Sequence, residues 1–217
     1  MTQGGKLYVE GRDDKWTIVN LLQRHGVDMT TRPLEVCSID ETMEGAAGVE
    51  ALLEFLPDAV RASLDAPIGF ILDIDTELSD RWAAVRARLM SAGLEPPANC
   101  PREGYVARLP EYPHPAGVWL MPDCRSDHGT LEDFLQRLIP AEEAELWAHA
   151  RAATGDAVQI GAEFPSSAVR KAELHCWLAW QRVPGTPFGL ALKARFLGHD
   201  SPEALALLGW LRRVFDL

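Results

Sequence analysis

The chain has 217 residues, 47% of them hydrophobic, which is enough for the core of one domain with an extension or of two closely joined lobes. Its 21 lysines and arginines are scattered and face 32 acidic residues, so the net charge of −11 gives no sign of the basic face that nonspecific nucleic-acid binding needs. The four cysteines are far apart and form no Cys-x-x-Cys pair, which disfavours a zinc site or a disulfide framework. No apolar run is long enough to span a membrane and no apolar leader is present, so we expect a soluble, cytoplasmic protein.

Four apolar segments are predicted to form the strands of a central sheet. They span residues 7–10, 33–38, 67–75 and 116–123. The third contains the continuous apolar run FIL, which is typical of a strand covered on both faces.

Helical patterns alternate with these strands. Three helices are predicted before the fourth strand: residues 13–24 with Asp13 as the cap, residues 47–60 with a break near Pro57, and a helix from the cap Ser79 to Gly93. The proline-rich stretch 94–116 is expected to be an excursion with a short edge strand at Tyr105–Leu109. Thr130 is predicted to begin a further helix, and helical segments follow at about 141–153, about 167–181, after the turn 184–189, and at 202–216.

Strands that alternate with helices favour an α/β fold with a mostly parallel sheet of about four strands flanked by helices. Residues 1–139 would form this core, and residues 140–217 a helical part packed on it. Trp177 and Trp180 lie in the largely apolar helix of this part, where a core position is expected for both.

Carboxylates stand where three of the predicted strands end. Glu10 ends the first strand, Asp73 and Asp75 end the third, and Asp123 ends the fourth. The carboxyl ends of parallel strands meet at one edge of the sheet, where α/β proteins bind ligands. Clustered carboxylates repel one another unless a cation bridges them, and hard oxygen ligands select Mg²⁺ or Mn²⁺. The pattern therefore predicts a site for one or two such ions.

Each acid also has a structural interpretation. Asp123 could simply begin a turn, since aspartate is common after a strand. Asp13 and Asp14 fit a helix cap and a first-turn acid better than they fit metal ligands.

The segments YVEGRDDK (8–15) and FILDIDTE (70–77) resemble the TOPRIM domain of topoisomerases, bacterial primases and overcoming-lysogenization-defect (OLD) nucleases. The resemblance implies a TOPRIM, Rossmann-like core in which Glu10 is the family's glutamate and Asp73 with Asp75 its Asp-x-Asp pair. Glu77 stands where some members have a third acid. The motifs cover roughly the first 80 residues.

HGTLEDFL (128–135) is similar to a segment of the OLD-like nucleases, which implies that Glu132 and Asp133 help to hold a second metal ion. The alternative is that Thr130 caps the helix and the two acids favour its dipole. The same resemblance implies that Lys171 stabilises the charge of a phosphate, although a surface lysine paired with an acid fits as well. His175 lies four residues further on the same helix, where we expect a partly buried histidine.

The rest of the chain narrows the activity. It has no room for a topoisomerase clamp, no cysteine set for a primase zinc module, and no GxxxxGK[ST] loop for ATP hydrolysis. We therefore expect a Mg²⁺- or Mn²⁺-dependent phosphodiester hydrolase, a nuclease acting on nucleic acid or a nucleotide, with Glu10 as a metal ligand or general base and Lys171 as the transition-state cation. The alternative is a catalytically silent TOPRIM module that binds a nucleotide or a protein partner such as an ATPase.

Overall fold

The structure is a computed structural model of the whole chain, and it describes residues 4–29, 31, 33–43, 48–63, 65–110 and 112–217. The strands are β1 (Gly5–Val9), β2 (Leu34–Ser38), β3 (Ile68–Asp73), β4 (Tyr105–Ala107) and β5 (Ala116–Met121). The α-helices are α1 (Arg12–Arg24), α2 (Ile39–Thr42), α3 (Gly48–Ala62), α4 (Leu78–Ser91), α5 (Leu131–Gln136), α6 (Ala144–Gln159), α7 (Val169–Ala179), α8 (Phe188–Ala191) and α9 (Pro202–Phe215).

The strands form one sheet in the order β2-β1-β3-β5-β4. β1, β2, β3 and β5 are parallel, and β4 pairs with β5 in the antiparallel direction at the edge. The expected α/β class with a mostly parallel sheet is confirmed. The sheet has one strand more than the four expected for its core. This additional strand is β4, the short edge strand predicted within the proline-rich excursion.

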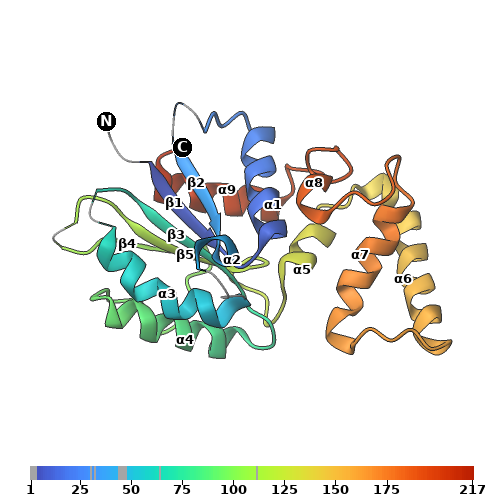
Figure 1. Cartoon of the computed structure of the whole chain (residues 1–217), viewed down its shortest axis with the longest axis horizontal. Helices are drawn as coiled ribbons and strands as arrows, with labels where there is room; N and C mark the ends of the chain where they lie inside the picture. Colours follow the sequence, from blue (N-terminus) through green and yellow to red (C-terminus); the bar gives the residue numbers. More distant parts are fainter. Residues whose placement is uncertain (1–3, 30, 32, 44–47, 64, 111) are drawn as a thin grey trace.

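Helices cover both faces of the sheet: α1 and α9 lie on one side and α3 and α4 on the other (Figure 1). α9 approaches the sheet closely because Gly117 in β5 has no side chain. A Cβ atom on Gly117 would collide with Val214 and would also lie 3.2 Å from the ring of Trp210. The last helix of the chain is therefore part of the packing around the sheet.

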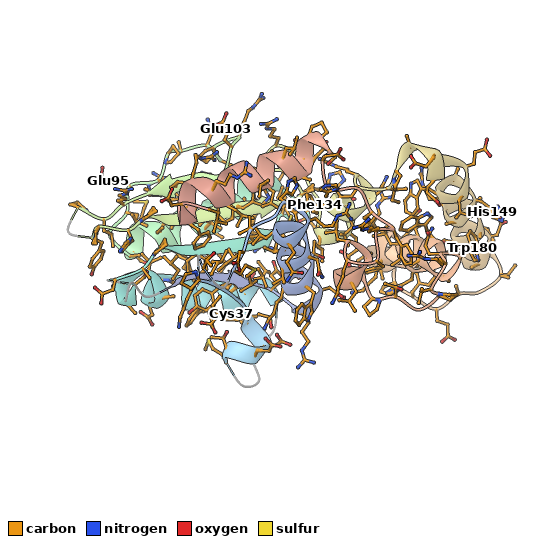
Figure 2. All side chains as sticks on the ribbon, turned by 90° about the horizontal axis from the view of Figure 1, so that it is seen from above. Cys37, Glu95, Glu103, Phe134, His149 and Trp180 are labelled. Atoms are coloured by element: carbon orange, nitrogen blue, oxygen red, sulfur yellow. The ribbon has the colours of Figure 1, made fainter. Side chains whose placement is uncertain are left out.

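The remaining helices extend the molecule to one side. Figure 1 shows α6 and α7 as a hairpin beyond α5, and Figure 2 shows Phe134 of α5 between the sheet and that hairpin. α8 packs on α1, where Asn20 Nδ2 donates to the carbonyl oxygen of Gly189 at 2.7 Å and the Gly189 N–H donates to Asp13 at 3.2 Å. The helical part is thus tied to the first helix of the core.

Several predicted boundaries were wrong. α1 begins at Arg12 with Gly11 as its N-cap, and α4 begins after Glu77, so neither Asp13 nor Ser79 is a cap. α3 continues through Pro57, because burial of the helix's apolar face outweighs the one backbone hydrogen bond that proline removes. The expected start of that helix at residue 47 lies outside the described residues.

Trp177 in α7 and Trp180 directly after it differ in burial. Trp177 is fully buried, as expected, but Trp180 is 42% exposed and stacks on His149 with ring centroids 5.1 Å apart. Figure 2 shows this pair on the side of the hairpin that faces away from the sheet. Trp180 is the C-cap residue that follows α7, which ends at Ala179, so it does not continue the buried face of that helix.

None of the helices in the described part of the chain is both long enough and apolar enough to cross a bilayer.

Candidate metal centre

The candidate site lies at the switch point of the sheet, where the direction in which successive strands are added reverses. From β1 the chain moves to β2 on one side, and from β3 it moves to β5 on the other. In open α/β sheets this divergence opens a crevice outside the carboxyl ends of the two central strands. Glu10 directly follows β1 and Asp73 is the last residue of β3. The backbone N–H of Asp73 donates to Glu10 Oε1 at 2.7 Å, so the structure brings these two predicted residues together.

A cavity of about 350 Å³ opens beside this hydrogen bond, and we call it the acidic pocket. It is lined by Glu10, Gly11, Arg12, Asp13, Asp14, Asp40, Asp73, Leu131, Glu132 and Lys171. Six of these side chains are carboxylates and two are basic. The pocket therefore concentrates negative charge at the crevice.

Burial and mutual repulsion change the acidity of this cluster. Burial raises the pKa of Glu10 to about 7 against the opposing effect of the Asp73 N–H, and the charge of Asp75 raises it further. Burial and the charge of Glu10 raise the pKa of Asp14 to about 8. The pKa of Asp73 is also raised, by burial and then by the charges of Glu10, Asp14 and Glu132. Glu10 and Asp14 therefore retain protons near neutral pH unless another positive charge enters the pocket.

Asp14 lies in the first turn of α1, as expected, and it also lines the acidic pocket, where the residue is only 9% exposed. α1 begins at Arg12 with Gly11 as its N-cap, and the charge of Glu10 acts on Asp14.

A tight loop brings the start of α5 to the same place. The backbone groups of Asp75 and Gly129 exchange two hydrogen bonds, of 2.9 and 3.0 Å. Gly129 has φ of 138°, and a Cβ atom there would lie 2.8 Å from Pro122 Cδ. Glycine is required at this position because other residues rarely adopt that backbone conformation.

The two acids that begin α5 have different roles. Glu132 lines the acidic pocket with a side chain that is 15% exposed, and it accepts a hydrogen bond from Thr130 Oγ1 at 2.8 Å. Asp133 accepts from the Thr130 N–H at 3.0 Å, which completes a capping box, and pairs with Arg170 Nε at 3.1 Å. The capping interpretation is therefore confirmed for Asp133, whereas a metal-binding role for Glu132 stays a prediction.

Asp75 and Glu77 lie beside the pocket and do not line it. Asp75 is 43% exposed and pairs with Arg81 Nη2 at 2.6 Å, although its charge acts on both Glu10 and Asp73. Glu77 is exposed and accepts the Ser79 hydroxyl at 3.2 Å. The second aspartate of the Asp-x-Asp pair is therefore at the rim of the site.

Asp123 is occupied elsewhere. It pairs with Arg137 Nη1 at 2.5 Å and accepts the backbone N–H groups of Arg125 and Ser126. Burial alone would raise the pKa of Asp123, but these hydrogen bonds outweigh it and lower the pKa. Asp123 closes the turn after β5, which is the structural role that the sequence left open.

Lys171 and His175 extend from α7 in the helical part. Lys171 lines the acidic pocket with its Nζ 3.6 Å from Glu132 Oε1, and its side chain is 53% exposed. His175 stacks on Phe188 with ring centroids 4.2 Å apart and does not line the pocket. Burial and the charge of Lys171 lower the pKa of His175.

Three residues of the site were missed from the sequence. Asp40 and Arg12 line the pocket, and Arg81 lies against its rim with a side chain 12% exposed. Asp40 could have been predicted from the sequence. β2 is parallel to β1, and Asp40 lies two residues after the last residue of β2, Ser38. Arg81 gives no signal in the sequence, because its ion pair with Asp75 depends on the path of α4.

The cluster can be tested for its fit to a divalent cation. Asp73 Oδ1 is buried without a hydrogen-bond partner in the described structure, as expected for a ligand oxygen. Oxygen donors in a pocket short of positive charge suit Mg²⁺ or Mn²⁺. Among the described residues, no three His, Cys, Asp or Glu side chains are already arranged to hold an ion, so carboxylates would have to turn when one enters.

The chain is thus an α/β protein with an acidic pocket at the switch point of its sheet. The family model described as "Protein of unknown function (DUF3226)" matches residues 5–216, so the chain belongs to the DUF3226 family. No curated protein and no solved structure matches the chain significantly.

Proposed function

We propose that this protein is a Mg²⁺- or Mn²⁺-dependent phosphodiester hydrolase of the TOPRIM type, a nuclease related to the OLD-like enzymes. The observation that carries the proposal is the convergence of Glu10, Asp73 and Glu132 from three separate elements on one pocket, with an oxygen of Asp73 left unpartnered. A scaffold has no use for buried carboxylates that raise one another's pKa, whereas a metal centre does.

Glu10, Asp73 and Glu132 would hold the cation, with Asp75 at the rim. A bound cation supplies Lewis-acid activation of water and stabilisation of phosphate charge. Glu10, whose pKa lies at about 7, has the acidity of a group that can accept a proton near neutral pH. Lys171 is exposed enough to reach a phosphate at the mouth of the pocket.

The charge of the pocket favours two ions over one. Six carboxylates and two basic side chains line it, so two divalent cations bring its formal charge to zero. With every carboxyl group ionised, one ion leaves the pocket with a negative charge that repels a phosphodiester. Two ions also clamp the attacking and leaving oxygens in the known two-metal sites.

A catalytically silent TOPRIM module that binds a nucleotide or a protein partner, such as an ATPase, is the second candidate. The observation that favours it is that no three ligand side chains of the described chain already form a coordination site. A silent module would leave the acids unoccupied at millimolar Mn²⁺.

Nicking of supercoiled plasmid in Mn²⁺ tests the proposal. We expect cleavage that requires the metal, is lost in Glu10→Gln, and falls at least tenfold in Lys171→Ala with partial recovery in Lys171→Arg. Asp80→Asn is the matched control, because Asp80 is an exposed acid of α4 outside the pocket. Equal rates for the wild type and Glu10→Gln would show that any cleavage comes from another protein.

A further inference from the structure

A second cavity lies at the opposite end of the sheet from the acidic pocket. Its volume is about 800 Å³, and it is lined at the amino ends of three parallel strands by Gly5, Pro67 and Pro115. β1 has five residues, so the two sites are separated by roughly 17 Å of strand. We call this cavity the arginine groove.

The lining of the arginine groove is mainly basic, whereas the chain as a whole is acidic. Arg108, Arg212, Arg213 and His114 line the groove, and among the described residues around it Asp216 is the one acidic side chain, next to the terminal residue Leu217. The net charge of the chain is −11, so three guanidinium groups in one groove are a local exception.

Among the described residues, the arginines of the groove have no acidic partner. Within the described part of the chain, the side chains of Arg108 and Arg212 make neither an ion pair nor a hydrogen bond, and Arg213 donates only to the carbonyl oxygen of Glu103. Figure 2 shows Glu103 beside α9, which carries Arg213. By contrast, Arg81 at the rim of the acidic pocket and Arg137 in the turn after β5 each pair with a carboxylate within 2.6 Å.

The end of α9 explains part of this arrangement. Arg212 and Arg213 lie in its last turn, where cations are favourable to the helix dipole. Arg108 comes from the segment after β4, and His114 from the segment before β5, so neither is explained by the helix. Two separate parts of the chain bring basic side chains to one cavity.

We propose that the arginine groove binds a phosphorylated ligand of nucleotide size without a metal ion. Guanidinium groups bind phosphate oxygens through paired N–H donors and keep their charge at all physiological pH values. A volume of about 800 Å³ is within the range of small-molecule sites. This inference does not depend on the proposed hydrolase activity.

Calorimetric titration of the full chain with ATP and with pyrophosphate, in metal-free buffer, tests the proposal. We expect saturable binding that weakens at least tenfold in Arg108→Gln/Arg212→Gln, since each lost charged hydrogen bond costs about one factor of ten or more. Arg88→Gln is the control for the loss of one positive charge outside the groove, because Arg88 is also exposed and lies on α4. It should change affinity less than twofold.

A 5′-phosphorylated oligonucleotide and its 5′-hydroxyl form distinguish the source of the phosphate. Tighter binding of the phosphorylated oligonucleotide than of ATP assigns the groove to nucleic-acid ends, and the reverse order assigns it to free nucleotides. Absence of binding by ATP, pyrophosphate and the phosphorylated oligonucleotide at millimolar concentration overturns the proposal. So does unchanged affinity in the double variant with a wild-type circular dichroism spectrum.

Discussion

The backbone N–H of Asp73 donates to Glu10 Oε1 at 2.7 Å, which joins the carboxyl ends of β1 and β3 through a side chain. This bond occupies one oxygen of Glu10. Separately, Asp73 Oδ1 is buried without a hydrogen-bond partner in the described structure. The bond between Glu10 and Asp73 therefore holds two of the pocket's carboxylates at adjacent strand ends.

We predict that Mn²⁺ stabilises the wild-type protein and leaves Asp73→Asn unchanged. A ligand that binds only the native state raises its unfolding free energy, and millimolar Mn²⁺ should raise the melting temperature by several degrees. The measurement is thermal unfolding with and without Mn²⁺, with Asp80→Asn as the control that keeps the full shift. Identical wild-type curves in both conditions would count against a metal site.

Stability in a chelating buffer should fall as pH rises from about 4 to about 8. The pKa of Glu10 is about 7 and that of Asp14 about 8 in the folded chain, whereas unfolded carboxyls titrate near pH 4. In this window the folded state holds more protons than the unfolded state, so the unfolding free energy decreases with pH.

Chemical denaturation across this pH range measures the slope. Asp14→Asn should reduce it and should raise the melting temperature at pH 8 by a few degrees, because a neutral amide replaces a carboxyl that ionises at a cost. Saturating Mn²⁺ should flatten the slope as well. Stability that rises from pH 5 to pH 8 in the chelating buffer would contradict the raised pKa values.

The sequence could predict the acids at strand ends because the geometry of a parallel sheet decides their position. Glu10 and Asp73 follow from two apolar runs and the rule that their carboxyl ends are adjacent. Asp14 could not be separated from an ordinary first-turn acid, since the sequence placed the cap at Asp13, two residues after Gly11, the N-cap of α1. The structural role of Asp123 depends on Arg137, which is 14 residues away and comes close only through the turn after β5.

The sequence predicted that the last third of the chain is helical, but it did not predict where each helix packs. Apolar spacing predicted α7 and α9, but nothing in it showed that α9 would return to the sheet. That contact depends on the missing side chain of Gly117, whose place is filled by Val214. Glycine in a strand is more often interpreted as a bulge or a weak point.

Glu132→Gln and Asp133→Asn should separate metal binding from helix capping. Glu132 faces the acidic pocket, so Glu132→Gln should weaken Mn²⁺ binding about tenfold or more and leave the melting temperature in chelator nearly unchanged. Asp133 completes the capping box, so Asp133→Asn should lower the stability by about 1 kcal/mol with little effect on Mn²⁺ affinity. Normal turnover of Glu132→Gln at saturating Mn²⁺ would reduce the site to one ion.

Gly129→Ala should destabilise the protein and weaken the site together. The backbone at Gly129 has φ of 138° and a Cβ atom would lie 2.8 Å from Pro122 Cδ, so we expect a loss of about 1–3 kcal/mol. The bridge to Asp75 positions α5 beside β3, and its distortion should move Glu132 away from Asp73. Gly155→Ala is the control, because a Cβ atom there meets nothing within 4 Å. Equal denaturation midpoints for the two variants would show that the loop tolerates a side chain.

Calorimetric titration of the wild-type chain with Mn²⁺ at about pH 7, in two buffers of different ionisation enthalpy, tests the metal centre most directly. Because the pKa of Glu10 is about 7 and that of Asp14 about 8, an entering cation displaces protons, so the observed heat must depend on the buffer. We predict saturable binding of one or two ions with proton release, both lost in Asp73→Asn. Absence of saturable binding by the folded protein at millimolar Mn²⁺ would contradict the metal centre and with it the proposed hydrolase.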